Sequence, residues 1–260
     1  YTFAHSVNTM VLTIALVRYL KYSNEDIKRI GIGVILADLG MANYHKKLTL
    51  RPSALSQSEM EEINKHPMFS VEFMKNNEID DPLINQLVIQ HHERWDGSGY
   101  PYGIKKEEIN KISRLFSVAD VYDAMTSIRP YRPAIPPYLV LAEILKLSGI
   151  QFDAKIANLF IKYIGVFPMG SMVELSTGRP ALVAGLNRED PLRPLVILFR
   201  FQKLEGVAEK RYGEVGVMLR RSQWELVDLS ADNEEDFGKI KRGLDHRKYN
   251  LSPEYYLSQI

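Results

Sequence analysis

Residues 91–101 read HHERWDGSGYP, and this stretch decides how the rest of the chain is interpreted. Glycine and proline do not continue a helix, so the paired histidines His91 and His92 are expected where a helix ends and a loop begins. Adjacent imidazoles are unusual on an ordinary helix, and they are ligands suited to iron, manganese or zinc. The stretch therefore predicts a functional loop on a metal-binding scaffold.

The composition limits the classes of function that remain open. The chain has 260 residues, a hydrophobic content of 45% and a formal net charge of +1 at pH 7. The length suits one large domain or two small ones. A charge this close to zero argues against a nucleic-acid polymer or a polybasic membrane anchor as partner. Because the chain has no cysteine, any metal must use histidine, carboxylate or water.

The first residues of the sequence bear on targeting and membrane insertion. Arg18 and Lys21 interrupt the first apolar stretch, so no run approaches the length of a membrane span. No signal peptide is visible, and a helical pattern begins abruptly at Tyr1, as in a fragment of a longer protein. We therefore expect a cytoplasmic protein without a membrane span in this chain.

Apolar residues recur with a helical period over the first 165 residues. Ser56 and Glu59 form a capping-box pattern at the start of one segment. In residues 24–39 the isoleucines, Ile32 and Ile35 among them, are expected to be largely buried. The helices are expected around residues 7–17, 24–39, from 56 onward, 82–92, 112–127, 137–148 and 153–164.

The pattern changes near Val166, where short apolar runs alternate with turn signals. The residues after about 230 are polar and charged, and they indicate weak helix or loop. The expected fold class is mainly α, a helical domain at 1–165 followed by a β-rich extension at 166–260 with a polar tail. Strands are expected at residues 172–175, 181–184, 195–201, 215–219 and 224–229.

Two aspartates lie in apolar helical segments. Asp38 lies in LADLG, residues 36–40, and Asp120 lies in FSVADV, residues 116–121. A charged aspartate in such a place is costly unless it is paired or binds a metal. Each alone is also explained as a helix-end or buried hydrogen-bonded acid. Together with the histidine pair they suggest a carboxylate-bridged metal site.

These residues resemble the HD-GYP domains, a branch of the HD phosphohydrolase superfamily. Besides residues 91–101, the resemblance rests on Arg114, on SVADVYDA at 117–124 and on RPYR at 129–132, and it covers about residues 1–170. It implies an HD-type helical bundle that hydrolyses cyclic di-GMP at a site of two or three irons.

The resemblance also implies a ligand set. Asp38 matches the aspartate of the HD pair, which is expected to bridge two metals, and Asp120 matches the distal aspartate; both are expected to be catalytic. One or two divalent ions, iron or manganese, are expected. His45 and His246 match no ligand and are expected at the surface. The implied metal ligands are His5, Asp38, His66, His91, His92 and Asp120.

The chain departs from the family pattern at three positions. Ala37 stands where the histidine of the HD pair is expected, Met41 where a phosphate-binding lysine is expected, and Tyr1 where some members have a glutamate ligand. One metal position keeps its four ligands, but the other lacks an imidazole. Losses of single groups that stabilise a transition state often cost about 2.7–4 kcal/mol. An inactive or very slow enzyme is therefore expected.

Recognition of the dinucleotide is better preserved. By resemblance, Tyr100, Arg129 and Arg132 match the positions that bind it, the arginines through phosphate or a guanine edge. The alternatives are that the arginines pair with acids of the bundle and that Tyr100 packs against Trp95. Asp96 is expected to fix the loop through backbone hydrogen bonds.

Three functions stay open from the sequence. The first is a degenerate phosphodiesterase that binds metal, cyclic di-GMP or both, with weak or no hydrolysis, and signals by binding. The second is an active phosphodiesterase that yields pGpG or GMP. The third is an interaction module whose Gly-Tyr-Pro loop contacts a partner such as a diguanylate cyclase domain. A homodimer is compatible with each, and the β-rich extension is expected to pack on the bundle or to mediate assembly.

Overall fold

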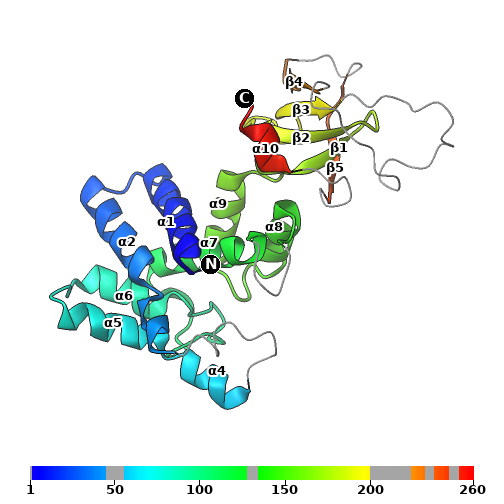
Figure 1. The fold of residues 1–260 in the computed structure, drawn as a ribbon. Helices are drawn as coiled ribbons and strands as arrows, with labels where there is room; N and C mark the ends of the chain where they lie inside the picture. The colour runs from blue at the N-terminus through cyan, green and yellow to red at the C-terminus, as the bar shows by residue number, and fades with distance from the viewer. Residues whose placement is uncertain (1, 45–55, 128–133, 200–223, 232–236, 246–251) are drawn as a thin grey trace. The chain divides into compact units, whose positions relative to one another are not determined.

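The computed structural model describes residues 2–44, 56–127, 134–199, 224–231, 237–245 and 252–260 (Figure 1). The chain divides into two compact units. The first comprises Tyr1–Ile135 and Val140–Tyr163, and the second comprises Pro136–Leu139 and Ile164–Ile260. The expected fold class, a mainly helical domain followed by a β-rich segment, is confirmed.

The first unit is built from helices whose ends follow ordinary capping rules. Ser56 accepts a hydrogen bond from the Glu59 amide and the Glu59 carboxylate accepts one from the Ser56 amide, so the predicted capping box is confirmed. The helices of the chain up to residue 164 are α1 (Thr2–Tyr19), α2 (Asn24–Leu36), the 3₁₀ helix η1 (Leu39–Asn43), α4 (Gln57–Ile63), α5 (His66–Asn76), α6 (Pro82–Gln90), the 3₁₀ helix η2 (Lys106–Glu108), α7 (Lys111–Thr126), α8 (Pro137–Lys146) and α9 (Ala154–Ile164).

The core of this unit forms where α1, α2, α6 and α7 meet. Helix α1 packs on α2 and α7, α2 packs on α6, and α5 packs on α6 and η1 (Figure 1). Ile30 and Val34 of α2 are buried, four residues apart on one helix face. The expectation that Ile32 and Ile35 are buried is wrong, since they are 44% and 37% exposed on other sides of α2.

The second unit contains a five-stranded antiparallel sheet in the order β4-β3-β2-β1-β5. One face buries Val173, Val183 and their neighbours, and the other packs Phe199 against Tyr256 of α10 (Pro253–Leu257). The strands are β1 (Met172–Leu175), β2 (Pro180–Gly185), β3 (Leu195–Phe199), β4 (Trp224–Asp228) and β5 (Ile240–Leu244).

Strand β5 corrects the sequence prediction. Its residues were expected as helix or loop because the tail is polar, yet the strand pairs with β1 along the edge of the sheet. Lys241 and Arg242 each form an ion pair with Glu174 on β1. Charged residues are common on edge strands, so the polar pattern concealed this one. The strand predicted at 215–219 lies outside the described residues.

Within the part of the chain that the structure describes, no helix combines the length and the apolar character that crossing a membrane requires.

Candidate metal centre

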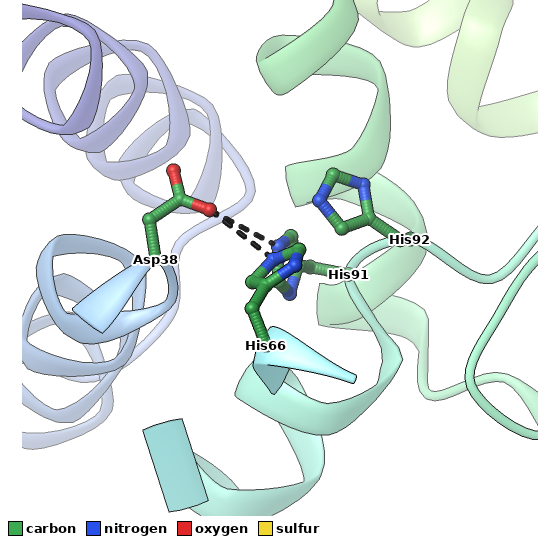
Figure 2. A group of neighbouring side chains, drawn as sticks. All are labelled: Asp38, His66, His91 and His92. Atoms are coloured by element: carbon green, nitrogen blue, oxygen red, sulfur yellow. Dashed lines mark ion pairs between the residues drawn. The ribbon is translucent and has the colours of Figure 1, made fainter. Parts of the chain in front are cut away.

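Four side chains from three segments converge in the helical unit, and we call them the Asp38 centre. Asp38 lies between α2 and η1, His66 begins α5, and His91 and His92 follow the last residue of α6. One ligand atom from each lies within 4.8 Å of those of the others (Figure 2). Asp38 Oδ1 is 3.3 Å from His66 Nε2 and 3.8 Å from His91 Nε2. The segments thus bring three imidazoles to one carboxylate.

The backbone determines which ring nitrogen of His66 and His91 faces the carboxylate. His66 Nδ1 lies 2.9 Å from the carbonyl oxygen of Ile63, and His91 Nδ1 lies 2.6 Å from that of Val88. A carbonyl only accepts, so each Nδ1 carries a proton, and in the neutral form of each ring the lone pair is on Nε2. Both Nε2 atoms are buried and make no hydrogen bond to the described residues. Two lone pairs facing a carboxylate oxygen require a cation or further protons between them.

The electrostatics of Asp38 and His92 also suit a cation. Burial opposes the ionisation of Asp38, but the interactions with His66 and His91 hold the pKa of this carboxyl well below its usual range. Burial, followed by the charges of His91 and His66, holds the pKa of His92 well below its usual range. The centre therefore offers a carboxylate and a neutral imidazole, which are the protonation states that metal binding requires.

The loop after the histidine pair folds back onto it. A Cβ atom on Gly99 would lie 2.5 Å from the Cα atom of Glu93, so this close approach requires glycine. The buried Glu93 carboxylate accepts a hydrogen bond of 2.8 Å from the Tyr102 amide. The predicted role of Asp96 is confirmed, because its carboxylate accepts a hydrogen bond of 2.9 Å from the Ser98 amide.

Tyr100 is placed beside the Asp38 centre by this loop. Its ring centroid is 4.7 Å from that of His92 and 6.1 Å from that of His66. The ring contacts described for Tyr100 are thus with the imidazoles rather than with Trp95, the alternative considered from the sequence. The role of Tyr100 in binding a nucleotide stays a prediction.

A second group of buried titratable side chains lies between α1 and α7, and we call it the His5 cluster. His5 Nδ1 is 2.6 Å from Asp123 Oδ2, and His5 Nε2 is 2.9 Å from Asp120 Oδ1. Burial opposes the charged imidazolium, but the hydrogen bonds to Asp120 and Asp123 outweigh it and raise the pKa of His5 to about 10. His92 Nδ1 lies 3.9 Å from Asp120 Oδ2 and links the two groups.

Asp123 is the member of the His5 cluster that sequence reasoning missed as a site residue. Its second oxygen, Oδ1, accepts hydrogen bonds from Asn8 Nδ2 at 3.0 Å and from Ser127 Oγ at 3.1 Å. Its spacing is a signal in the sequence, since residues three apart share a helix face and Asp120 is a candidate ligand. The contact with His5, 118 residues away, needed the packing of α1 on α7.

The predicted site residues therefore fall into two groups. Asp38, His66, His91 and His92 converge, whereas His5 pairs with Asp120 and with Asp123. Ala37 is buried, with 1% of its surface exposed, and presents only a methyl group beside Asp38. The predictions for Tyr1, His45, Arg129, Arg132 and His246 concern residues outside the described ranges.

Fold and site together define a helical domain with a histidine–aspartate centre whose donor set suits a divalent metal ion. The comparison with protein families agrees, because the model of the HD domain matches residues 4–156. The chain belongs to the HD domain family, and its resemblance to the HD-GYP branch is confirmed.

Curated relatives extend this assignment. The chain is 31% identical over 199 residues to the cyclic di-GMP phosphodiesterase PA4108 of Pseudomonas aeruginosa, covering 76% of this chain and 48% of that protein. It is 26% identical over 196 residues to the cyclic di-GMP phosphodiesterase PdeB of Borreliella burgdorferi, covering 75% of this chain and 52% of that protein. The chain thus spans about half the length of these relatives.

A solved structure shares the fold. The protein Bd1817 of Bdellovibrio bacteriovorus, described as a HDG"Y"P protein, superimposes with a TM-score of 0.51 at 18% sequence identity. The match covers 62% of this chain and 51% of that one. At this level of identity the likeness concerns the fold alone.

Proposed function

We propose that this domain binds a divalent metal ion at the Asp38 centre and binds cyclic di-GMP beside it, with weak or no hydrolysis. One observation carries the proposal: four ligand side chains converge, while Ala37, next to Asp38, has only a methyl group. The relatives named cyclic di-GMP phosphodiesterases support the choice of nucleotide.

The side chains of the Asp38 centre fit a resident metal ion. Three imidazoles and a carboxylate form a donor set for iron or manganese. The buried Nε2 atoms of His66 and His91, which make no hydrogen bonds to the described residues, are the atoms that would hold it. A bound divalent ion supplies Lewis-acid stabilisation of a phosphate oxygen and lowers the pKa of a water molecule. The protein contributes ring orientation, through the carbonyls of Ile63 and Val88, and negative charge, through Asp38.

A second metal position is proposed to be weak. Its ligands by resemblance are His5, Asp38 and Asp120, and Ala37 leaves it one imidazole short. In the structure a hydrogen bond joins the side chains of His5 and Asp120, so a metal would have to replace the proton between them. Met41 supplies no positive charge where a lysine is expected. Removing one group that stabilises transition-state charge costs about 2.7–4 kcal/mol in an oxyanion hole, and by analogy we propose slow or absent turnover.

Nucleotide binding is proposed for the rim of the centre. The Tyr100 ring, beside His92, can stack on a base or donate its hydroxyl hydrogen bond. Arg129 and Arg132 are proposed to bind phosphate or a guanine edge. Replacing either arginine by alanine should weaken cyclic di-GMP binding measured by calorimetry, and unchanged affinity would contradict this part of the proposal.

The alternative is an active cyclic di-GMP phosphodiesterase. The intact set of Asp38, His66, His91 and His92 favours it, together with the relative that is 31% identical and carries that name. In this case water would take the place of the missing imidazole, and Asp38 and Asp120 would serve as the catalytic carboxylates.

Metal content and turnover measured on the same preparation separate the two functions. The chain is loaded with iron or with manganese, metal per chain is determined, and conversion of cyclic di-GMP is followed. One metal ion with nucleotide binding and little turnover supports the proposal, whereas two metal ions with rapid turnover support the phosphodiesterase. His66→Ala should abolish any turnover, and His246→Ala, at a histidine with no predicted ligand role, serves as the matched control. Residual activity in His66→Ala points to a contaminating enzyme.

A further inference from the structure

Ser70 connects the two segments that carry Asp38 and His66. It lies on α5, one turn after His66, and is fully buried. Its hydroxyl donates a hydrogen bond of 2.7 Å to the carbonyl oxygen of Ala37 and accepts one of 2.7 Å from the amide of Gly40. These two backbone groups stand on either side of Asp38 in the chain. A single hydroxyl group therefore holds both ends of the turn that presents the only carboxylate of the Asp38 centre.

The backbone contact around this hydroxyl is unusually close. A Cβ atom on Gly40 would lie 2.1 Å from the carbonyl oxygen of His66 and 2.8 Å from the amide nitrogen of Ser70. The turn containing Asp38 thus packs directly on the first turn of α5, and only glycine, which has no Cβ atom, allows the two backbones to approach this closely. Because His66 is the first residue of α5, the same contact sets the distance between the two ligands.

We propose that Ser70 is a positioning residue of the metal centre, holding Asp38 at ligating distance from His66. The inference rests on the metal-binding part of the proposed function. His66 cannot follow a displaced carboxylate, because its Nδ1 is fixed by the carbonyl of Ile63. Asp38 can move away, because 23% of its side chain is exposed to solvent.

Loss of the hydroxyl would act on Asp38 through the backbone. Without it, the Ala37 carbonyl and the Gly40 amide lose their partner in a buried place. Such groups seek other partners, and the turn between them shifts. Binding sites tolerate displacements of only about 0.5 Å, so a small shift of Asp38 is enough to weaken metal binding.

The test compares Ser70→Ala with Ser113→Ala. Ser113 is also fully buried, but it lies on α7 and its hydroxyl is 3.5 Å from the carbonyl of Gln86. Binding of Mn²⁺ alone is measured by calorimetry, and urea unfolding is measured on the metal-free proteins. Both variants are expected to lose some stability, but only Ser70→Ala should weaken Mn²⁺ binding, by about 10–100-fold as for other residues that orient ligands. Equal Mn²⁺ affinity in wild type and Ser70→Ala would overturn the proposal.

A second variant keeps the test open if Ser70→Ala does not fold. Ser70→Cys keeps a hydrogen-bonding group at the same place, but the thiol is somewhat larger and is a weaker donor and acceptor than the hydroxyl. It should give a smaller loss of Mn²⁺ affinity and a changed Mn²⁺ electron paramagnetic resonance spectrum, which a purely structural role would leave unaltered. Wild-type affinity and spectrum in Ser70→Cys would count against positioning.

The outcomes also separate this inference from the proposed function. Wild type that binds Mn²⁺ but not cyclic di-GMP would remove the nucleotide from the proposal and leave the role of Ser70 intact. Wild type that binds no Mn²⁺ would overturn both the metal centre and the positioning role.

Discussion

The Asp38 centre and the His5 cluster are made of the same two residue types in opposite proportions. The first brings three imidazoles to one carboxylate, and the Nε2 atoms of His66 and His91 that face it make no hydrogen bonds to the described residues. The second places one imidazole between the carboxylates of Asp120 and Asp123, and both ring nitrogens of His5 have partners. An imidazolium satisfies the second arrangement with a proton, but the first has spare lone pairs that a metal ion would satisfy. An excess of imidazoles over carboxylates thus favours a metal site, whereas an excess of carboxylates favours a salt bridge.

Neutralising the carboxylate of the Asp38 centre tests whether these four side chains form a metal site. Asp38→Asn keeps the shape of the side chain but removes its charge. Because the loss of residues that merely orient ligands costs 10–100-fold in metal affinity, loss of this ligand should cost more than about 100-fold. Calorimetry with Mn²⁺ measures the effect, and Asp96→Asn, in the adjoining loop, is the control with an intact centre. Comparable Mn²⁺ affinity in Asp38→Asn and wild type would show that the four side chains do not form the metal site.

Restoring the family residues tests whether the second position can become a metal site. Ala37→His together with Met41→Lys should raise cyclic di-GMP turnover by at least about 100-fold, because each group supplies a comparable amount of transition-state stabilisation. Ala37 is buried, so the larger side chain should also cost about 1–3 kcal/mol of stability through overpacking. Turnover, metal content and urea unfolding are measured together. A folded double variant without any gain in turnover would mean that other groups limit the reaction.

Neutralising Asp123 separates the two groups of side chains. In Asp123→Asn, the donors Asn8 and Ser127 should attract the amide oxygen, which turns the NH₂ group toward His5 Nδ1. Loss of the charged hydrogen bond should lower the free energy of unfolding by about 1.5–3 kcal/mol. The affinity of the Asp38 centre for Mn²⁺ should stay within about threefold of wild type, since Asp123 lies outside this centre.

Ser127→Ala is the matched control for Asp123→Asn. It removes one neutral donor from the same carboxylate and leaves the contact with His5 in place. A smaller loss of stability, about 0.5–1.5 kcal/mol, is expected in urea unfolding. If Asp123→Asn weakened Mn²⁺ binding as much as Asp38→Asn does, the two groups would have to be treated as one site.

Much of the fold could be predicted because helical periodicity and caps are local signals. The capping box of Ser56 and Glu59, and the end of α6 at the histidine pair, follow from neighbouring residues alone. Strand β5 could not be predicted, because its lysine and arginine have the polar pattern of an unstructured tail. Their partner, Glu174 of β1, is brought beside them only by the fold.

The site shows the same limit. The convergence of Asp38 with the three histidines was expected from resemblance to a family, since their segments are far apart in the chain. The bonds from Ser70 to Ala37 and from Asp123 to His5 depend on distances between packed helices, and neither residue type signals them. Ligands are thus easier to predict than the residues that hold them.

The smallest expected effect comes from an ion pair that belongs to neither group. Arg29 of α2 donates hydrogen bonds of 2.7 Å from Nε and Nη2 to Asp81, whose carboxylate also caps α6. The hydrogen bonds from Arg29 hold the pKa of Asp81 below its usual value. The stability contributed by this pair is therefore present above the unfolded pKa of about 3.9 and is lost as the pH falls through the folded value.

Asp81→Asn isolates the charge, because asparagine is also a good helix N-cap. At pH 7 it should lower the free energy of unfolding by no more than about 1 kcal/mol, as expected for a partly exposed pair, and the difference from wild type should shrink below pH 4. Mn²⁺ binding should not change. A loss at pH 7 as large as that of Asp123→Asn would mean that partial exposure does not weaken an ion pair in this domain, and the contrast between buried and exposed charges would fail.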